Sequence, residues 1–111
     1  AGAVQLAQFD LVQVGGITEG RKIAAYAQMR HLAVTTKNYS TAVSTAAALH
    51  FLYALPNADC LEIDQDPNDL HTRLACHPLY RIEDGLAAPA SDRPGLGVEI
   101  DEAALARHRA G

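Results

Sequence analysis

The spacing of hydrophobic positions changes in a regular order along the chain. Short apolar stretches at 4–8, 32–36 and 60–63 are typical of β-strands, and the second is apolar or β-branched throughout, as in a strand buried on both faces. Between them, residues 21–30 and 41–55 place small and apolar side chains on one helical face. The order β-α-β-α-β predicts a parallel sheet with right-handed crossovers, and therefore an α/β fold.

The pattern of the last third is different. Residues 70–76 have the composition of one or two helical turns, and the runs 79–82 and 86–88 flank an Asp-Gly pair that is typical of a β-hairpin. Asp101 has the position of an N-cap for a last helix that reaches about residue 108. We therefore divide the chain into 1–77, three βα units, and 78–111, a hairpin and short helix that pack back on them.

Three local features complete this first description. Thr18 is the expected N-cap of the first helix, and Gly15-Gly16 before it indicates a tight turn more than a phosphate cradle. On the second helix, His50, Phe51 and Tyr53 are expected to be packing residues.

Composition narrows the class of protein. The 111 residues are 49% apolar, with 9 Lys and Arg against 13 Asp and Glu. This excludes a disordered chain, and the lack of a basic cluster argues against nucleic acid as a partner. No apolar run approaches the roughly 18 residues that a membrane helix needs. Cys60 and Cys76 are too few for a disulfide framework, so we expect reduced core thiols in a cytoplasmic protein.

The beginning of the chain has its own implication. It starts Ala-Gly-Ala-Val, its one methionine is Met29, and the first expected strand begins almost at once. Three parallel strands alone would leave both sheet edges bare. We therefore expect a segment of a longer protein.

Polar residues follow the three expected strands. Asp10, the run Lys37, Asn38 and Tyr39, and Glu62 fall at successive strand ends. Functional groups of parallel α/β folds collect at these carboxyl ends, and two carboxylates with an amine suit acid/base chemistry. The alternative is a solvated rim with incidental ion pairs.

Several stretches, in one order, carry a resemblance to a known family. They are QFD…GGITE…KIA at 8–24, AAALH at 46–50, LE at 61–62, and PGLGVE at 94–99 followed by DE. Their succession resembles the sixth βα unit, seventh helix, eighth strand and C-terminal tail of the mandelate racemase/muconate lactonizing enzyme family, within the enolase superfamily.

The resemblance implies a modified (β/α)₈ TIM-type barrel with a capping domain, of which this chain holds βα units 6–8 and the tail. A barrel of this kind needs about 250 residues. The family binds Mg²⁺ through carboxylates on strands three to five, so the metal ligands are not in this chain. It abstracts a proton α to a carboxylate. The implied parent is a cytoplasmic homo-oligomer, a dehydratase, racemase or epimerase of a sugar acid or hydroxy acid. This segment alone is expected to be inactive and to need the missing strands or another chain for folding.

The resemblance also implies roles for single residues. Asp10 matches the aspartate that orients the base on the seventh strand, although it could simply cap the glycine turn. Glu62 matches a glutamate that hydrogen-bonds the enolate oxygen as a protonated carboxyl. Asn38 and Tyr39 would line the seventh loop and touch substrate.

Lys37 departs from the family pattern because it stands where the base histidine is expected. None of the 5 histidines can replace that histidine. A lysine beside a carboxylate stays protonated, since an opposite charge favours the charged form, so Lys37 is a poor base. It is therefore a catalytic group of another kind, a contact for a substrate carboxylate, or a rim ion pair.

Two other classes of protein compete with this interpretation. A non-catalytic remnant or interaction module would account for the lysine at position 37. An unrelated small α/β binding domain would not account for the ordered motifs.

Overall fold

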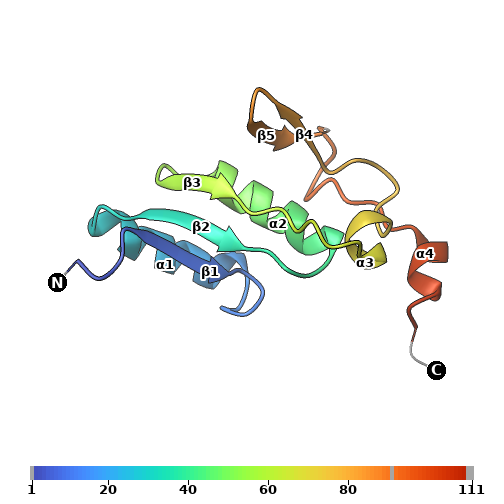
Figure 1. Cartoon of the computed structure of the whole chain (residues 1–111), viewed down its shortest axis with the longest axis horizontal. Helices are drawn as coiled ribbons and strands as arrows, with labels where there is room; N and C mark the ends of the chain where they lie inside the picture. The colour runs from blue at the N-terminus through green and yellow to red at the C-terminus, as the bar shows by residue number, and fades with distance from the viewer. Residues whose placement is uncertain (1, 91, 110–111) are drawn as a thin grey trace.

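A three-stranded parallel sheet forms the centre of the molecule, with strand order β1-β2-β3 (Figure 1). A computed structural model describes residues 2–90 and 92–109. The strands are β1 (Leu6–Asp10), β2 (Ala33–Lys37) and β3 (Ala58–Leu61), connected by the helices α1 (Ile17–Met29) and α2 (Ala42–Tyr53). The β-α-β-α-β order and the parallel pairing predicted from the sequence are confirmed.

The remaining elements follow the sheet. They are the short helix α3 (Asp69–Thr72), the antiparallel hairpin of β4 (Tyr80–Glu83) and β5 (Leu86–Pro89), and helix α4 (Glu102–Ala106). Asp84 and Gly85 turn the hairpin with φ of 51° and 77°. These positive angles suit a two-residue turn of this sequence. Asp101 caps α4 by accepting hydrogen bonds from the N–H groups of Ala103 and Ala104.

Helices α1 and α2 cover one face of the sheet and leave the other without helix cover (Figure 1). The core lies between the sheet and α1 and α2, where Phe9 meets Phe51 edge-on with ring centroids 6.0 Å apart. Gly20 lets α1 approach closely, because a Cβ there would lie 2.6 Å from Leu11 Cδ1. The core cluster and the residues packed on it are Ala7, Phe9, Leu11, Ala24, Ala27, Leu32, Val34, Ala47, Phe51, Leu52, Leu55 and Leu61.

β3 contains a bulge. Val34 pairs with Ala58 and Thr36 with Leu61, so Asp59 and Cys60 together oppose the single residue Thr35. The Thr35 hydroxyl donates to the Cys60 carbonyl at 2.6 Å and so supplies the bulged strand with a partner. A bulge of this kind re-aims the side chains that follow it.

Four expectations from the sequence were wrong in detail. β1 covers 6–10, not 4–8, because its register with β2 continues to Asp10 and Lys37. Helix α1 begins after Gly16, whose φ of 88° favours glycine, and Thr18 lies inside the first turn. Cys60 and Cys76 are exposed thiols, not core thiols. Tyr53 is 69% exposed, whereas Phe51 is buried as expected.

The chain is extended for its length. Its radius of gyration is 15.0 Å, whereas a compact domain of this size would have about 13 Å. Part of the sheet accordingly faces solvent, including Leu6 at 38% exposure.

Candidate functional site

Three charged side chains lie in one row at the carboxyl edge of the sheet. Asp10 is the last residue of β1 and pairs in register with Lys37, the last residue of β2. Thr36 pairs with Leu61, so the next residue, Glu62, comes level with Lys37. The sequence had suggested that Glu62 lies inside the third strand. In the structure it follows the end of β3. The row alternates carboxylate, amine, carboxylate.

The row belongs to the face of the sheet that the helices leave open. Phe9, Thr36 and Leu61, the neighbours of these three residues, are directed toward the helices, and Phe9 and Leu61 pack on the core. Because side chains alternate along a strand, Asp10, Lys37 and Glu62 are directed to the opposite face. The sheet therefore separates a packing side from a side that is free for chemistry.

Asp10 is held by the turn that follows it. One carboxylate oxygen, Oδ1, accepts hydrogen bonds from the N–H groups of Val12 at 2.8 Å and Gln13 at 3.1 Å. This fixes the orientation of the side chain at the beginning of the turn that leads to α1. Within 2–90 and 92–109, no hydrogen bond reaches Oδ2, so this oxygen is available to a group on the open face.

Lys37 is exposed at the centre of the row. No ion pair within 4.0 Å joins it to Asp10 or Glu62 among the residues that the structure describes. Its ammonium group therefore keeps its capacity to bind an external anion.

Glu62 is held by donors from both other strands. Its Oε2 accepts a hydrogen bond from Gln8 Nε2 of β1 at 2.7 Å. Its Oε1 accepts one from the main-chain N–H of Asn38, just beyond β2, at 3.1 Å. Glu62 is thus fixed across the full width of the sheet.

The Asn38 side chain was expected to contact substrate, but it does not lie on the open face. Asn38 is buried, 3% exposed, and its side chain turns back toward α2. Nδ2 donates to Thr45 Oγ1 at 2.7 Å, and Oδ1 accepts from the Ser44 hydroxyl at 2.6 Å. The side chain thereby ties the end of β2 to α2, and its main-chain N–H is left for Glu62.

Tyr39 is exposed and joins two loops at the same edge. Its hydroxyl donates to Asp66 Oδ2 at 2.8 Å, which connects the loop after β2 to the loop after β3. This hydrogen bond, with the charges of Asp66 and Asp64, raises the pKa of the Tyr39 phenol above its ordinary value of 10.0. Tyr39 is therefore a neutral hydroxyl at the rim of the open face.

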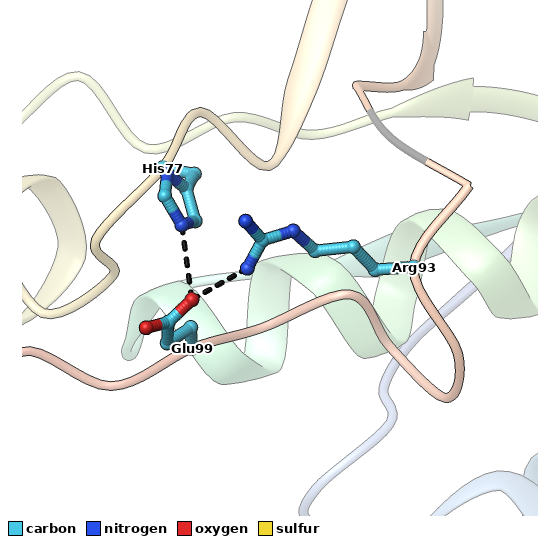
Figure 2. A network of polar contacts seen from close by, with 3 residues as sticks. All are labelled: His77, Arg93 and Glu99. Carbon is cyan, nitrogen blue, oxygen red and sulfur yellow. Dashed lines mark hydrogen bonds and ion pairs between the residues drawn. The ribbon is translucent and has the colours of Figure 1, made fainter.

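A second polar cluster lies in the C-terminal tail. Oε2 of Glu99 contacts His77 Nε2 at 3.0 Å and accepts a hydrogen bond from the guanidinium of Arg93, as Figure 2 shows. The pKa of the Glu99 carboxyl lies below its ordinary value, chiefly because of Arg93 and to a smaller extent because of His77. Partial desolvation, together with the charges of Glu99 and Asp101, raises the pKa of the Cys76 thiol although the residue is exposed. Sequence reasoning missed this cluster because it joins two separate loops, one with His77 and the other with Arg93 and Glu99, neither of which has a periodic pattern.

The described residues do not make a magnesium site. In the ranges 2–90 and 92–109, no group of three or more His, Cys, Asp or Glu side chains is placed to share a metal ion. Asp10 and Glu62 stand on either side of β2, and each is already bound by N–H donors. No step of the chemistry is therefore assigned to a metal on these residues.

Comparison with known proteins identifies the family. The profile described as "Enolase C-terminal domain-like" matches residues 1–104. This chain belongs to the mandelate racemase/muconate lactonizing enzyme family of the enolase superfamily. Its α/β fold is the one expected for the C-terminal part of the barrel in this family.

Enzymes of the superfamily are similar to the chain over nearly its whole length. D-galactarolactone cycloisomerase of Agrobacterium fabrum is 33% identical over 98% of the chain, and a D-mannonate dehydratase of Caulobacter vibrioides is 35% identical over 88%. The chain spans only 30% and 24% of the lengths of these two relatives.

A solved structure extends the comparison to three dimensions. The structure of a candidate L-alanine-DL-glutamate epimerase from Burkholderia xenovorans strain LB400, bound to magnesium and fumarate, superposes with a TM-score of 0.82 and 29% identity. It covers 96% of this chain, which spans 26% of that protein. Among the described residues, no helix of this chain is long and apolar enough to cross a membrane.

Proposed function

We propose that the protein containing this chain abstracts the proton α to the carboxylate of a sugar acid or hydroxy acid, as a dehydratase, racemase or epimerase. The row of Asp10, Lys37 and Glu62 at the carboxyl edge of a parallel sheet carries this proposal. The row lies where active sites of barrel enzymes are built. The related cycloisomerase and dehydratase, named for sugar-acid chemistry, support the class of substrate.

Each residue of the row has a proposed role. Lys37, exposed and central, holds the negative charge of the substrate carboxylate or of the enolate formed from it. Asp10 is oriented by its turn and balances the Lys37 charge through Oδ2. Glu62, as a protonated carboxyl, donates a hydrogen bond to the oxygen on which charge develops, from the position set by Gln8 and Asn38.

The rim supplies the proposed substrate contacts. Tyr39 offers its exposed hydroxyl, and Asn38 contributes through the position of the main chain beside Lys37. A lysine in place of the base histidine leaves this side of the site without a group suited to accept a proton. We therefore propose that proton transfer runs from the opposite face, through a residue outside this chain.

The properties of the complete protein are part of the same proposal. Its Mg²⁺ would be bound by residues outside this chain, and the solved relative with bound magnesium supports this. The open sheet face and edges favour completion by further strands or another chain, and we expect a homo-oligomer that binds no nucleic acid. Two exposed free thiols suit a reducing compartment, which favours the cytoplasm. Alone, the 111 residues are expected to be inactive.

Deuterium exchange tests the proposal. The complete gene product that contains this chain is incubated in D₂O with a panel of sugar acids and hydroxy acids, and loss of the α-proton signal is followed by NMR. Exchange with one or more acids is expected, and Lys37→His should speed it by restoring a base. Lys22→His, on the exposed side of α1, is the matched control and should change nothing.

Two results would contradict these assignments. If no acid in the panel exchanges its α-proton, the proposed reaction is wrong. If Lys37→His abolishes a measurable native activity, Lys37 is itself the working residue and its assignment as an anion contact is wrong.

A non-catalytic interaction module is the second candidate. The departure at Lys37 favours it, because the residue that the family uses as a base is replaced by a poor one. The reading frame upstream of Ala1 separates the two candidates. Further βα units encoded in that frame favour the enzyme, and an upstream sequence that encodes none favours the module.

A further inference from the structure

Glu62 occupies a position that its own strand does not determine. It follows the end of β3, and the bulge of Asp59 and Cys60 precedes it. A glutamate in such a place has several rotatable bonds, and ordering them costs conformational entropy. The two donors that order it are Gln8 Nε2 of β1 and the N–H of Asn38, the residue that follows β2.

The length of the Gln8 side chain matches its reach across the sheet. Neighbouring strands are about 4.8 Å apart, so β1 and β3 are separated by about 10 Å. Two long side chains that extend toward each other over β2 can close this gap, and Gln8 and Glu62 meet at 2.7 Å. Thr35 lies between them on β2 and is 2% exposed. Asparagine at position 8 would be too short to make this contact.

The second donor is fixed by the helix layer. Asn38 is held through its buried side chain by Thr45 and Ser44 of α2, so its main-chain N–H has little freedom. The helix-covered side of the sheet thereby sets the direction of one oxygen of Glu62, and Gln8 sets the other. Each oxygen keeps a second lone-pair position, and in the protonated carboxyl one of these positions carries the hydrogen that is donated to a ligand.

We propose that Gln8 is a positioning residue for Glu62, holding its carboxylate in the row with Lys37 and Asp10 from a strand that Glu62 does not touch through its main chain. This inference rests on the proposed function and deepens it. Gln8 touches no reacting atom and acts through Glu62 alone. Its removal should therefore reduce turnover and leave the binding of substrate nearly unchanged.

Two substitutions at position 8 test the inference in the complete gene product. Gln8→Met keeps the length of the side chain and removes the donor, and Gln8→Asn keeps the amide and removes the reach. Each is expected to lower kcat for α-proton exchange by about 3-fold to 10-fold, as loss of a hydrogen bond between uncharged groups does, with KM nearly constant. Gln28→Met, on the exposed side of α1, is the control for the same chemical change.

A double-substitution cycle separates positioning from general destabilisation. If Gln8 acts through Glu62, adding Gln8→Met to Glu62→Gln causes no further loss of kcat. A merely structural role for Gln8 would give the same loss in both backgrounds and would overturn the inference. An unchanged kcat in Gln8→Met, where Glu62→Gln is impaired, would overturn it as well.

The crystal structure of Gln8→Met supplies a readout that does not depend on activity. Displacement of the Glu62 carboxylate from the row supports the inference even if no acid proves to be a substrate, in which case only the proposed function has failed. A Glu62 carboxylate that stays in place, on Asn38 alone, overturns the inference whatever the activity.

Discussion

The two faces of the central sheet are built from the same strands but from different chemistry. The face toward α1 and α2 carries Ala7, Phe9, Val34 and Leu61, all packed against the core. The open face carries polar residues, of which Gln8 and Glu62 bind each other, Asp10 binds the turn that follows it and Thr35 binds the bulge; they are Gln8, Asp10, Thr35, Lys37 and Glu62. Strand alternation thus lets strands of 4 or 5 residues support packing on one face and chemistry on the other, so substitutions on the two faces should have different effects.

The largest expected effect concerns the bare edges and open face of the isolated chain. β1 and β3 each lack a partner on one side among the described residues, and Leu6 and Val4 are exposed near one edge. Unpaired strand edges are templates for association, so the 111 residues alone should aggregate. Sedimentation velocity at micromolar concentration measures this. A monomer that melts cooperatively in calorimetry would contradict the prediction.

On the covered face, the loss of one aromatic ring should strongly reduce the free energy of unfolding. Phe51 is 3% exposed and contacts Phe9, so Phe51→Ala should cost about 3–5 kcal/mol in the complete gene product. Tyr53→Ala on the same helix is the control. Tyr53 is 69% exposed, and its removal should change stability by about 0.5 kcal/mol or less. Urea denaturation measures both, and equal losses would mean that α2 packs differently.

Two adjacent threonines of β2 compare the faces directly. Thr35 Oγ1, on the open face, donates to the carbonyl of the bulge, so Thr35→Val should destabilise by about 1 kcal/mol. Thr36 Oγ1, on the covered face, is buried with no hydrogen-bond partner among the described residues. Thr36→Val keeps the shape and removes the unpaired hydroxyl, so it should be neutral or stabilising by about 1 kcal/mol. Destabilisation by Thr36→Val would show that this hydroxyl has a partner in solution.

The smallest effect is a shift in titration at the rim of the open face. Asp66 raises the pKa of Tyr39 above 10.0, so Asp66→Asn should lower that pKa toward 10.0. Phenolate absorbance against pH measures it, with Tyr39→Phe to assign the signal and Asp69→Asn as a control that leaves the Tyr39 contact intact.

The same shift has a consequence for stability. Because the pKa of Tyr39 in the folded protein is raised, its contribution is fully present below the unfolded value of 10.0 and is lost as pH rises through the folded pKa. The opposite dependence, with stability gained in that alkaline range, would contradict the Tyr39–Asp66 contact.

The covered face was the easier of the two to predict from the sequence. Periodicity identifies strands and helices because burial imposes it, and the order of the three strands and the two main helices followed from it. The row of Asp10, Lys37 and Glu62 was predictable for a related reason, since the carboxyl ends of parallel strands share one edge.

The details of the open face could not be predicted in the same way. Gln8 and Glu62 are 54 positions apart and belong to no repeat, so nothing local indicates their hydrogen bond. Asparagine is common in exposed loops, yet Asn38 is buried because Ser44 and Thr45 form hydrogen bonds with its side-chain amide. Glu62 was placed inside a strand because alternation alone does not reveal that two residues oppose Thr35.

The bulge in β3 has a consequence for insertions and deletions. Because two residues oppose Thr35, Leu61 comes opposite Thr36 and faces the core, and Glu62 faces the open side. Deletion of Asp59 alone would close the bulge, place Cys60 opposite Thr35 and keep Leu61 opposite Thr36. Deletion of both Asp59 and Cys60 would instead exchange the faces, directing the Glu62 carboxylate toward the core and Leu61 to the open face. At the bulge, a gap of one residue in an alignment of relatives therefore leaves the core and the charged row in place, whereas a gap of two residues changes which side chains face the core.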